Sequence, residues 1–280
     1  MLKFMITEFQ DAVDRWHSQV RRHHSQSIAA QQNFDPNQDF WEGMAQNFKD
    51  DPFRKGDPVI DRLEQEFADC GTLVDIGGGA GRLALPLSLS RESVTVVDSS
   101  KSMLAELKDS CDEAKIENVY SVFGLWEDAV IDIHEGALCS HVTYGIENIG
   151  KFLENVNQYA SKRVVIIAFM KSPQAHLENL WREVHEEERV HLPGVPELMD
   201  VLWQLEIAPE LSIIEHLGPH IYGSEEDAIS DLRRRLYVNQ GTRKDEILTR
   251  VLNSDLEPTD QGMELANSDG RISCLISWNN

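Results

Sequence analysis

The segment LVDIGGGAG at residues 73–81 places a carboxylate directly ahead of a run of glycines. Its apolar start is typical of a buried strand, and Asp75 lies near the end of that strand. The glycines allow positive φ and a close approach of the main chain to a ligand. A carboxylate inside such a turn repels a pyrophosphate, so this segment predicts a ligand that is cationic or zwitterionic at this point.

The spacing of these glycines separates two classes of nucleotide cofactor. A dinucleotide fingerprint, G-x-G-x-x-G, that starts at Gly77 needs a glycine where the chain has Arg82. One that starts at Gly78 needs a glycine where the chain has Ala80. The pattern D-x-G-x-G-x-G, in contrast, is complete from Asp75 onward. The spacing therefore disfavours a dinucleotide-dependent oxidoreductase.

The complete pattern resembles the first motif of the class I S-adenosylmethionine-dependent methyltransferases. The resemblance implies that Asp75 helps to hold the amino end of the cofactor. It also implies that the backbone of the turn passes beside the methionine part of the cofactor, at Gly77, Gly78, Gly79 and Gly81. S-adenosyl-L-methionine is accordingly the expected cofactor.

A second apolar run, SVTVVD at residues 93–98, ends in another acid, Asp98. A carboxylate at this place can accept hydrogen bonds from both ribose hydroxyls, as in dehydrogenases, so Asp98 indicates a nucleoside ligand without choosing the cofactor. The segment SSKSML that follows resembles the start of the next helix in many class I methyltransferases. This likeness implies cofactor contacts for Ser99 and Met103, although an ordinary core position for Met103 remains open.

The segment FGLWED at residues 123–128 departs from the family pattern. Many members have an acid after the glycine, which accepts a hydrogen bond from the adenine amino group, whereas this chain has Leu125. The backbone of Leu125 and Trp126 can still read the adenine edge. Trp126 either stacks on the base or packs between helices.

The run ALCSHVTYG at residues 137–145 resembles the fourth motif of the family, which ends beside the transferred methyl group. The resemblance places Ser140 and His141 at the cofactor, with His141 and Tyr144 as the catalytic candidates. A histidine with an ordinary pKa of about 6.5 can remove a proton from an acceptor hydroxyl, amine or carbon acid. Alternatively, His141 only forms a hydrogen bond with the cofactor.

Strand and helix patterns alternate around these motifs and indicate how they are positioned. Short apolar runs predict strands at 72–77, 93–98, 118–123, 136–144, 163–169, 211–217 and 271–278. Helical spacing is found at 56–68, after Ser100, after Ile149, at 196–206 and at 224–252. The alternation predicts an α/β fold with a doubly wound, mostly parallel seven-stranded sheet and helices on both faces. Ligands of such sheets bind beyond the carboxyl ends of the strands.

Two regions outside the alternation are candidates for the acceptor side of the site. Residues 1–55 predict an N-terminal helical lid, and residues 56–280 a methyltransferase core. The core carries substrate-side insertions at about 171–207 and 218–270, the second being a helical insertion before the last strand. Side chains of these regions that can line an acceptor pocket are Trp16, His17, Trp41, Phe48, His176, Trp181, His185 and His191.

Composition limits the partners and the compartment. A formal net charge of -22, from 48 acidic and 26 basic side chains, disfavours nucleic acid and anionic membrane surfaces. The four cysteines show no metal-binding or disulfide spacing, and the histidines of HEEERVH at 185–191 do not share a helix face, so no metal is expected. We expect a cytoplasmic protein with no membrane partner, and a homodimer remains open.

These inferences lead to one expected function and two alternatives. The expectation is an enzyme that transfers methyl from S-adenosylmethionine to an O, N or C nucleophile of a small molecule. The first alternative is a methyltransferase-like nucleoside-binding protein without methyl transfer, which the departure at Leu125 leaves open. The second is the dinucleotide-dependent oxidoreductase that the glycine spacing disfavours.

Overall fold

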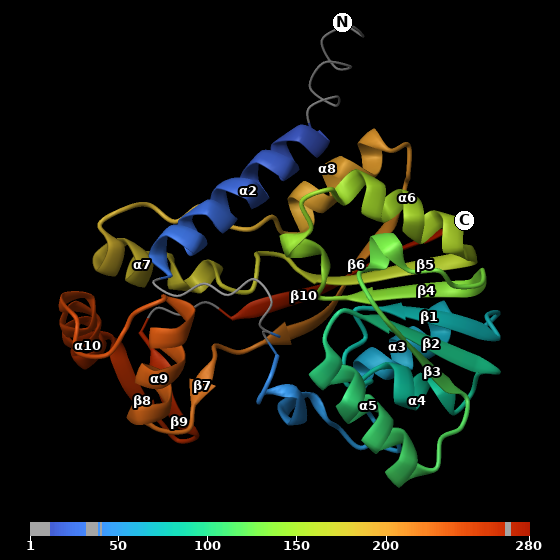
Figure 1. The fold of residues 1–280 in the computed structure, drawn as a ribbon, viewed down its shortest axis with the longest axis horizontal. Helices are drawn as coiled ribbons and strands as arrows, with labels where there is room; N and C mark the ends of the chain where they lie inside the picture. The colour runs from blue at the N-terminus through green and yellow to red at the C-terminus, as the bar shows by residue number, and fades with distance from the viewer. Residues whose placement is uncertain (1–11, 32–38, 40, 267–269) are drawn as a thin grey trace, which may run out of the picture.

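The computed structural model of the chain describes residues 12–31, 39, 41–266 and 270–280. A seven-stranded sheet forms its centre, with strand order β3-β2-β1-β4-β5-β10-β6 (Figure 1). Neighbouring strands from β3 to β5 are parallel, whereas β10 runs antiparallel to both β5 and β6. The predicted doubly wound, mostly parallel α/β sheet is therefore confirmed.

The strands of this sheet agree with the apolar runs of the sequence, with one shift. Their bounds are β1 Thr72–Ile76, β2 Ser93–Asp98, β3 Val119–Phe123, β4 His134–Ser140, β5 Ala160–Phe169, β6 Glu210–Leu217 and β10 Arg271–Asn279. β4 ends at Ser140, four residues before the predicted end, because His141 adopts a positive φ of 58°. The chain then forms the short 3-10 helix η3, Thr143–Gly145.

Helices cover both faces of the sheet, as expected for strands that are buried on both sides. One face carries α3 (Pro58–Glu66), α4 (Ala84–Ser88) and α5 (Lys101–Ala114). The other face carries α6 (Ile149–Tyr159) and α8 (Val195–Gln204), with the N-terminal helix α2 (Ala12–Ala30) packed on them (Figure 1). Alternate strand residues feed the two cores: Val74 and Ile76 face α6, whereas Leu73 faces α3.

The helix starts follow from their capping residues. Asp57 accepts hydrogen bonds from the first free amides of α3, and Pro58 occupies a first-turn position where its missing N–H is not needed. Ser100 caps α5 by accepting from the amide of Met103. The cap of α5 directly follows β2, so it fixes the backbone that leaves Asp98.

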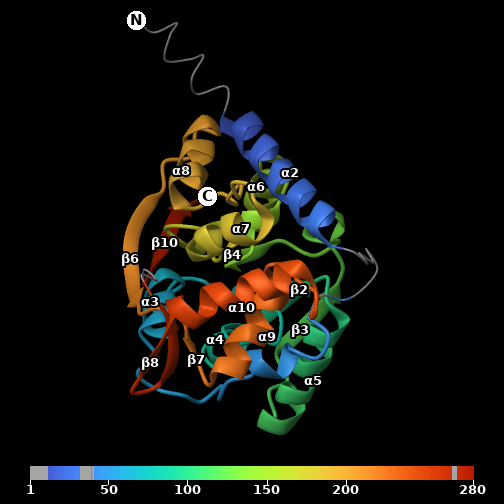
Figure 2. The ribbon, with the colours of Figure 1, turned by 90° about the vertical axis from the view of Figure 1, so that its left-hand side faces the viewer.

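The insertion between β6 and β10 forms a small layer with its own core, seen at the front in Figure 2. It contains α9 (Glu225–Arg235), α10 (Arg243–Asp255) and a three-stranded sheet of order β7-β9-β8. The strands are β7 Ile221–Tyr222, β8 Leu256–Thr259 and β9 Gly262–Leu265, and α7 (Glu178–His185) packs against this layer. The helical stretch predicted at 224–252 is thus two helices, and the sheet was not predicted.

The N-terminal region contributes α2 and the 3-10 helix η1, Ala45–Phe48. Polar side chains of α2 bind the segment 188–191, as Gln19 and Gln26 donate to the carbonyl oxygens of His191 and Glu188. Trp16 of α2 is buried and donates its indole N–H to the carbonyl oxygen of Ile146. Among the described residues, no helix has the length and apolar character needed to cross a bilayer.

Candidate functional site

A cavity of about 690 Å³ lies at the carboxyl ends of β1, β2 and β4. This is the edge of the sheet at which doubly wound folds bind ligands. Strand ends, the glycine turn and the segment that contains η1 form its walls. Its lining includes Asp75, Gly77, Gly78, Gly79, Asp98, Ser99, Met103, Leu125, Trp126, Ser140 and His141. The structure therefore brings together eleven of the twelve residues that the sequence assigns to the cofactor, and leaves out Gly81.

Asp75 is a buried carboxylate at the cavity wall that lacks a partner. The residue is 2% exposed, and among the described residues no hydrogen-bond donor reaches either oxygen. Burial, with a smaller contribution from the negative charge of Asp98, raises the pKa of Asp75 to about 7. A buried and unsatisfied carboxylate is costly, so a bound ammonium group would stabilise it.

Asp98 faces the same cavity but is held by the backbone. Its Oδ2 accepts from the amide of Gly79 at 2.9 Å, and its Oδ1 accepts from the amide of Ser100 at 2.8 Å. Burial raises the pKa of Asp98 despite these bonds, and Asp39 adds to the effect. Each carboxylate oxygen has two lone pairs, so both retain capacity for further donors such as ribose hydroxyls.

The glycine turn requires glycine for two different reasons. Gly79 has a φ of +55°, and a Cβ there would come no closer than 3.5 Å to Met103 and 3.8 Å to Asp98. Its free side therefore faces the space between these residues at the cavity. Gly81, with a φ of +83°, does not line the cavity, and a Cβ there would lie 2.4 Å from Leu107 of α5. Gly81 thus packs against a helix, and its contact with the cofactor stays a prediction.

The expected adenine side of the cavity is apolar. Met103 is 5% exposed and forms a small buried cluster with Ala45 and Ala80, yet it also lines the cavity. Trp126 packs edge-on against Tyr159 at 5.5 Å and reaches the cavity as well. Leu125 is 58% exposed and lines the cavity, while Asp128, two positions beyond Trp126, does not. Met103 and Trp126 therefore each pack against core residues and also line the cavity.

His141 lines the cavity with an exposed side chain, while Tyr144 lies behind it. The Nδ1 atom of His141 is 2.9 Å from the Tyr144 hydroxyl, which also accepts from the amide of Phe169 at 2.7 Å. Desolvation of the imidazole by the protein around it, followed by the charges of Arg82 and Arg271, lowers the pKa of His141 to about 4. Burial raises the pKa of Tyr144. Tyr144 is 5% exposed and does not line the cavity, so the structure does not bring it to the cavity surface with His141, and its catalytic role stays a prediction.

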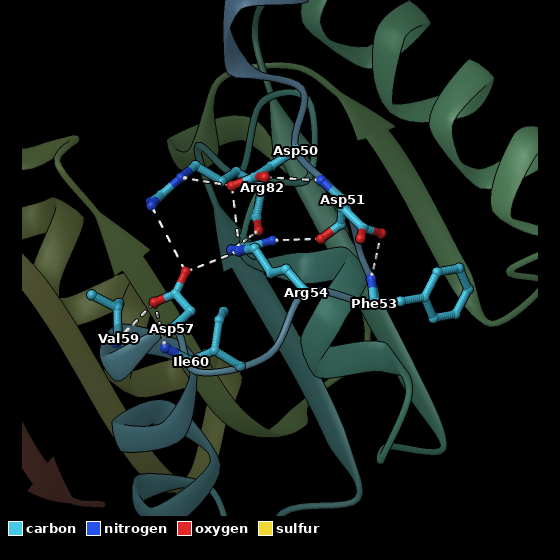
Figure 3. Close-up of polar contacts among 8 residues, drawn as sticks. All are labelled: Asp50, Asp51, Phe53, Arg54, Asp57, Val59, Ile60 and Arg82. Carbon is cyan, nitrogen blue, oxygen red and sulfur yellow. Dashed lines mark hydrogen bonds and ion pairs between the residues drawn. The ribbon is translucent and has the colours of Figure 1, made fainter.

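A network of ion pairs fixes the roof of the cavity, the segment 47–50, to the glycine turn (Figure 3). Arg54 lies at its centre and donates from Nε to Asp57 and from Nη2 to the carbonyl oxygen of Arg82, both at 2.9 Å. Arg82 lies 3.8 Å from the carboxylate of Asp50, and both residues line the cavity. Lys49 ties the roof to α5 through ion pairs on the opposite side.

Several lining residues were not predicted from the sequence. They are Ile76, Ala80, Leu83, Val97, Gly124, Glu127, Val142, Ile146 and Phe152, with Arg82 and the roof residues Asn47, Lys49 and Asp50. For Arg82, its position directly after the glycine turn could have indicated a place in the cavity lining. Of the aromatic candidates for the acceptor pocket, Trp41 and Phe48 line the cavity and contact each other edge-on at 5.1 Å. Trp16 and Trp181 are instead 1% exposed core residues.

Of the four histidines named as acceptor-side candidates, none lines the cavity, and three form contacts elsewhere. His17 contacts the carbonyl oxygen of Glu147, and His185 contacts that of Leu236. His191 forms an ion-pair contact with Glu178 at 3.1 Å. In the part of the chain that the structure describes, no group of three or more potential metal ligands is arranged around one point.

Comparisons with known proteins extend the structural description. No family model matches the chain. Over 64 residues it is 42% identical to the ribosomal RNA small subunit methyltransferase G of Lactobacillus helveticus (strain DPC 4571). That match covers 22% of this chain and 27% of the relative, so the chain spans about a quarter of the length of the curated protein that it matches.

Solved structures resemble this chain over most of its length. The YcgJ protein of Bacillus subtilis superimposes with a TM-score of 0.55 at 17% identity, over 79% of this chain and 98% of that one. A protein of Bacillus halodurans C-125 that is provisionally classed as a methyltransferase gives a TM-score of 0.52 at 13% identity, over 78% of this chain and 96% of that one. With the strand order and the cavity at the carboxyl ends of the strands, these likenesses show that the chain has the class I methyltransferase fold.

Proposed function

We propose that this protein is an S-adenosylmethionine-dependent methyltransferase that acts on an O, N or C nucleophile of a small molecule. The observation that carries the proposal is Asp75, a buried carboxylate without a partner among the described residues, at the wall of a cavity beside a glycine turn. A dinucleotide would bring its pyrophosphate to this turn, where the ionised Asp75 repels it. A zwitterionic amino acid moiety instead supplies the positive charge that Asp75 lacks.

The residues of the cavity fit the parts of the proposed cofactor. Asp75 would hold the ammonium group, and Asp98 would accept from the ribose hydroxyls while its backbone bonds keep it in place. Met103, Leu125 and Trp126 offer an apolar surface for the adenine. When bound, the cofactor supplies a methyl group on a positively charged sulfur. The protein then needs chiefly to orient the acceptor and exclude water.

The hydrogen bonds around His141 favour a role as a donor rather than a general base. The Tyr144 oxygen already accepts from the Phe169 amide, so its own hydrogen is free to point to Nδ1 of His141. In this arrangement, which follows from satisfying each polar atom, the imidazole carries its proton on Nε2. With a pKa of about 4 the ring is neutral at pH 7 and only weakly basic. His141 therefore serves to orient a bound group by donating a hydrogen bond.

The ribosomal RNA methyltransferase relative raises RNA as a second acceptor class. The net charge of -22 argues against it, because a phosphate backbone is bound through clustered basic side chains. Among the described residues, the arginine that lines the cavity is Arg82, and it already lies near the carboxylates of Asp50 and Asp57. A small molecule is therefore the better match to this surface.

One experiment tests the reaction and separates the acceptor classes. The protein is incubated with S-adenosylmethionine labelled in its methyl group and with a cell extract divided into metabolite and RNA fractions. We expect S-adenosylhomocysteine to form and label to enter the metabolite fraction. Label in RNA alone would replace the small-molecule assignment. Cofactor binding without turnover in any fraction would favour a nucleoside-binding protein without methyl transfer.

A further inference from the structure

Arg271, the first residue of β10, does not itself line the cavity but lies behind its His141 side. Its guanidinium carbon is 5.1 Å from the centroid of the Phe169 ring. The same Phe169 ring is 4.2 Å from the imidazole ring of His141, which lines the cavity. A single aromatic ring thus separates Arg271 from the wall at which the proposed function places the acceptor.

The charge of Arg271 is not neutralised within the described chain. Its Nε atom is buried and has no hydrogen-bond partner there, and none of the described carboxylates lies within ion-pair distance. The arginines of α9 differ, since Arg233 pairs with Asp245, and Arg234 and Arg235 share Asp231. In a chain with 48 acidic and 26 basic side chains, a half-buried arginine without a carboxylate indicates that an external anion completes the site.

The side chains around Arg271 add donors but few further charges. Burial, Arg235 and Arg271 lower the pKa of His176 to about 4, and burial followed by Arg235 also lowers that of His220. Both imidazoles are therefore neutral at pH 7 and can each donate one hydrogen bond. Tyr222, whose ring meets that of His220 edge-on at 4.5 Å, has a buried hydroxyl without a partner among the described residues.

We propose that Arg271 binds a carboxylate of the methyl acceptor, across the Phe169 ring from His141. One unpaired guanidinium matches the single negative charge of a carboxylate. The planar guanidinium can also donate two parallel hydrogen bonds to a carboxylate, which fixes the orientation of the acceptor. This inference rests on the proposed methyltransferase function and narrows its substrate to carboxylic acids.

The test compares acids with their amides on protein saturated with S-adenosylhomocysteine. The probes are benzoate and benzamide, 4-hydroxybenzoate and 4-hydroxybenzamide, and indole-3-acetate and indole-3-acetamide, with phenyl phosphate as the other anion. Ligand-observed NMR gives the affinities for the wild type, for Arg271→Gln, and for Arg250→Gln. Arg250 is an exposed residue of α10 and serves as the matched control. Binding of S-adenosylhomocysteine to each variant is measured first, by calorimetry, and shows that the variant is folded.

We expect at least one acid to bind the wild type about tenfold or more tightly than its amide, the difference expected from charge-assisted hydrogen bonds. Arg271→Gln removes this preference and leaves S-adenosylhomocysteine binding unchanged, and Arg250→Gln changes neither. The inference is overturned if no acid is preferred while S-adenosylhomocysteine binds, if phenyl phosphate is preferred to every acid, or if the preference survives in Arg271→Gln. If S-adenosylhomocysteine does not bind the wild type, that result would instead contradict the proposed methyltransferase function.

Discussion

At the scale of single residues, Asp75 makes cofactor binding depend on pH. In the free protein its pKa is raised to about 7, and an ammonium group binds only the ionised carboxylate. Affinity is therefore greatest above pH 7 and falls as the pH drops through 7. We expect S-adenosylhomocysteine to bind about tenfold more weakly at pH 6 than at pH 8, with release of a proton at pH 6, as calorimetry in two buffers would show.

The control is Asp75→Asn, whose affinity should be weak and constant over this range. The same raised pKa lowers the stability of the free wild type as the pH rises from about 4 to about 7, because the folded state keeps a proton that the unfolded state has lost. Asp75→Asn should remove this slope in thermal unfolding. A wild-type affinity that is equal at pH 6 and pH 8 would contradict the role given to Asp75.

The two glycines with different surroundings provide a matched pair of substitutions. Gly79→Ala adds a methyl group that meets no close contact, so it should cost only about 1–2 kcal/mol in backbone strain while obstructing the ligand. Gly81→Ala forces a contact with Leu107 and should add about 1–3 kcal/mol from overpacking. We expect Gly79→Ala to lose S-adenosylhomocysteine binding and Gly81→Ala to lose mainly stability. The reverse pattern in calorimetry and thermal unfolding would contradict the proposal that the cofactor binds in this cavity beside Gly79.

The sequence predicts the cavity residues well where one local motif carries them. Asp75, Gly79 and Asp98 follow from strand ends and turn spacing, which adjacent residues determine. Tyr144 is a catalytic candidate because the run 137–145 resembles the fourth motif of the family, in a strand predicted to extend to residue 144. The positive φ of His141 ends that strand early, and the chain then turns Tyr144 into the core. A single backbone conformation of this kind leaves no periodic signal in the sequence.

At the scale of elements, the roof of the cavity depends on Arg54. This side chain joins the segment after η1 to Asp57 at the start of α3 and to the backbone of Arg82. Arg54→Ala should lower the stability by about 1–3 kcal/mol, because the largely buried carboxylate of Asp57 loses its charged partner. It should also weaken S-adenosylhomocysteine binding severalfold, because the roof residues lose their anchor.

The matched control for this prediction is Lys108→Ala, which removes an exposed ion pair with Asp112 on α5. An exposed pair contributes little, so neither stability nor binding should change measurably. Denaturant unfolding measures the stability of both variants, and calorimetry measures their affinity for S-adenosylhomocysteine. Unchanged cofactor affinity in Arg54→Ala, alongside the expected loss of stability, would show that the roof closes without this network.

Elements defined by contacts between distant residues could not be predicted in this way. The roof residues 47–50 are held at the cavity by ion pairs with Arg82, Glu106 and Glu113, and no local sequence pattern predicts these pairs. The three-stranded sheet of the insertion consists of strands of two to four residues, too short to show alternation. Helices with clear caps, such as α3 and α5, were predicted within a few residues of their bounds.

At the scale of the whole molecule, the order of buried strands is the strongest feature of the sequence. Short apolar runs separated by helical patterns permit few arrangements, and the predicted seven-stranded, mostly parallel sheet is confirmed. The proposed acceptor site depends instead on how the insertion and β10 meet near His141. Arg271 carried no signal in the sequence, because its importance arises from lacking the carboxylate partners that Arg233 and Arg235 have.

Calorimetric titration of the purified protein with S-adenosylmethionine tests the central claim most directly. We predict one site per chain, competition by S-adenosylhomocysteine but not by NAD, and an affinity at least tenfold lower in Asp98→Ala, which loses the acceptor for the ribose hydroxyls. The fold of that variant should persist, as circular dichroism would show. Absence of S-adenosylmethionine binding, or tight binding of NAD in its place, would contradict the account.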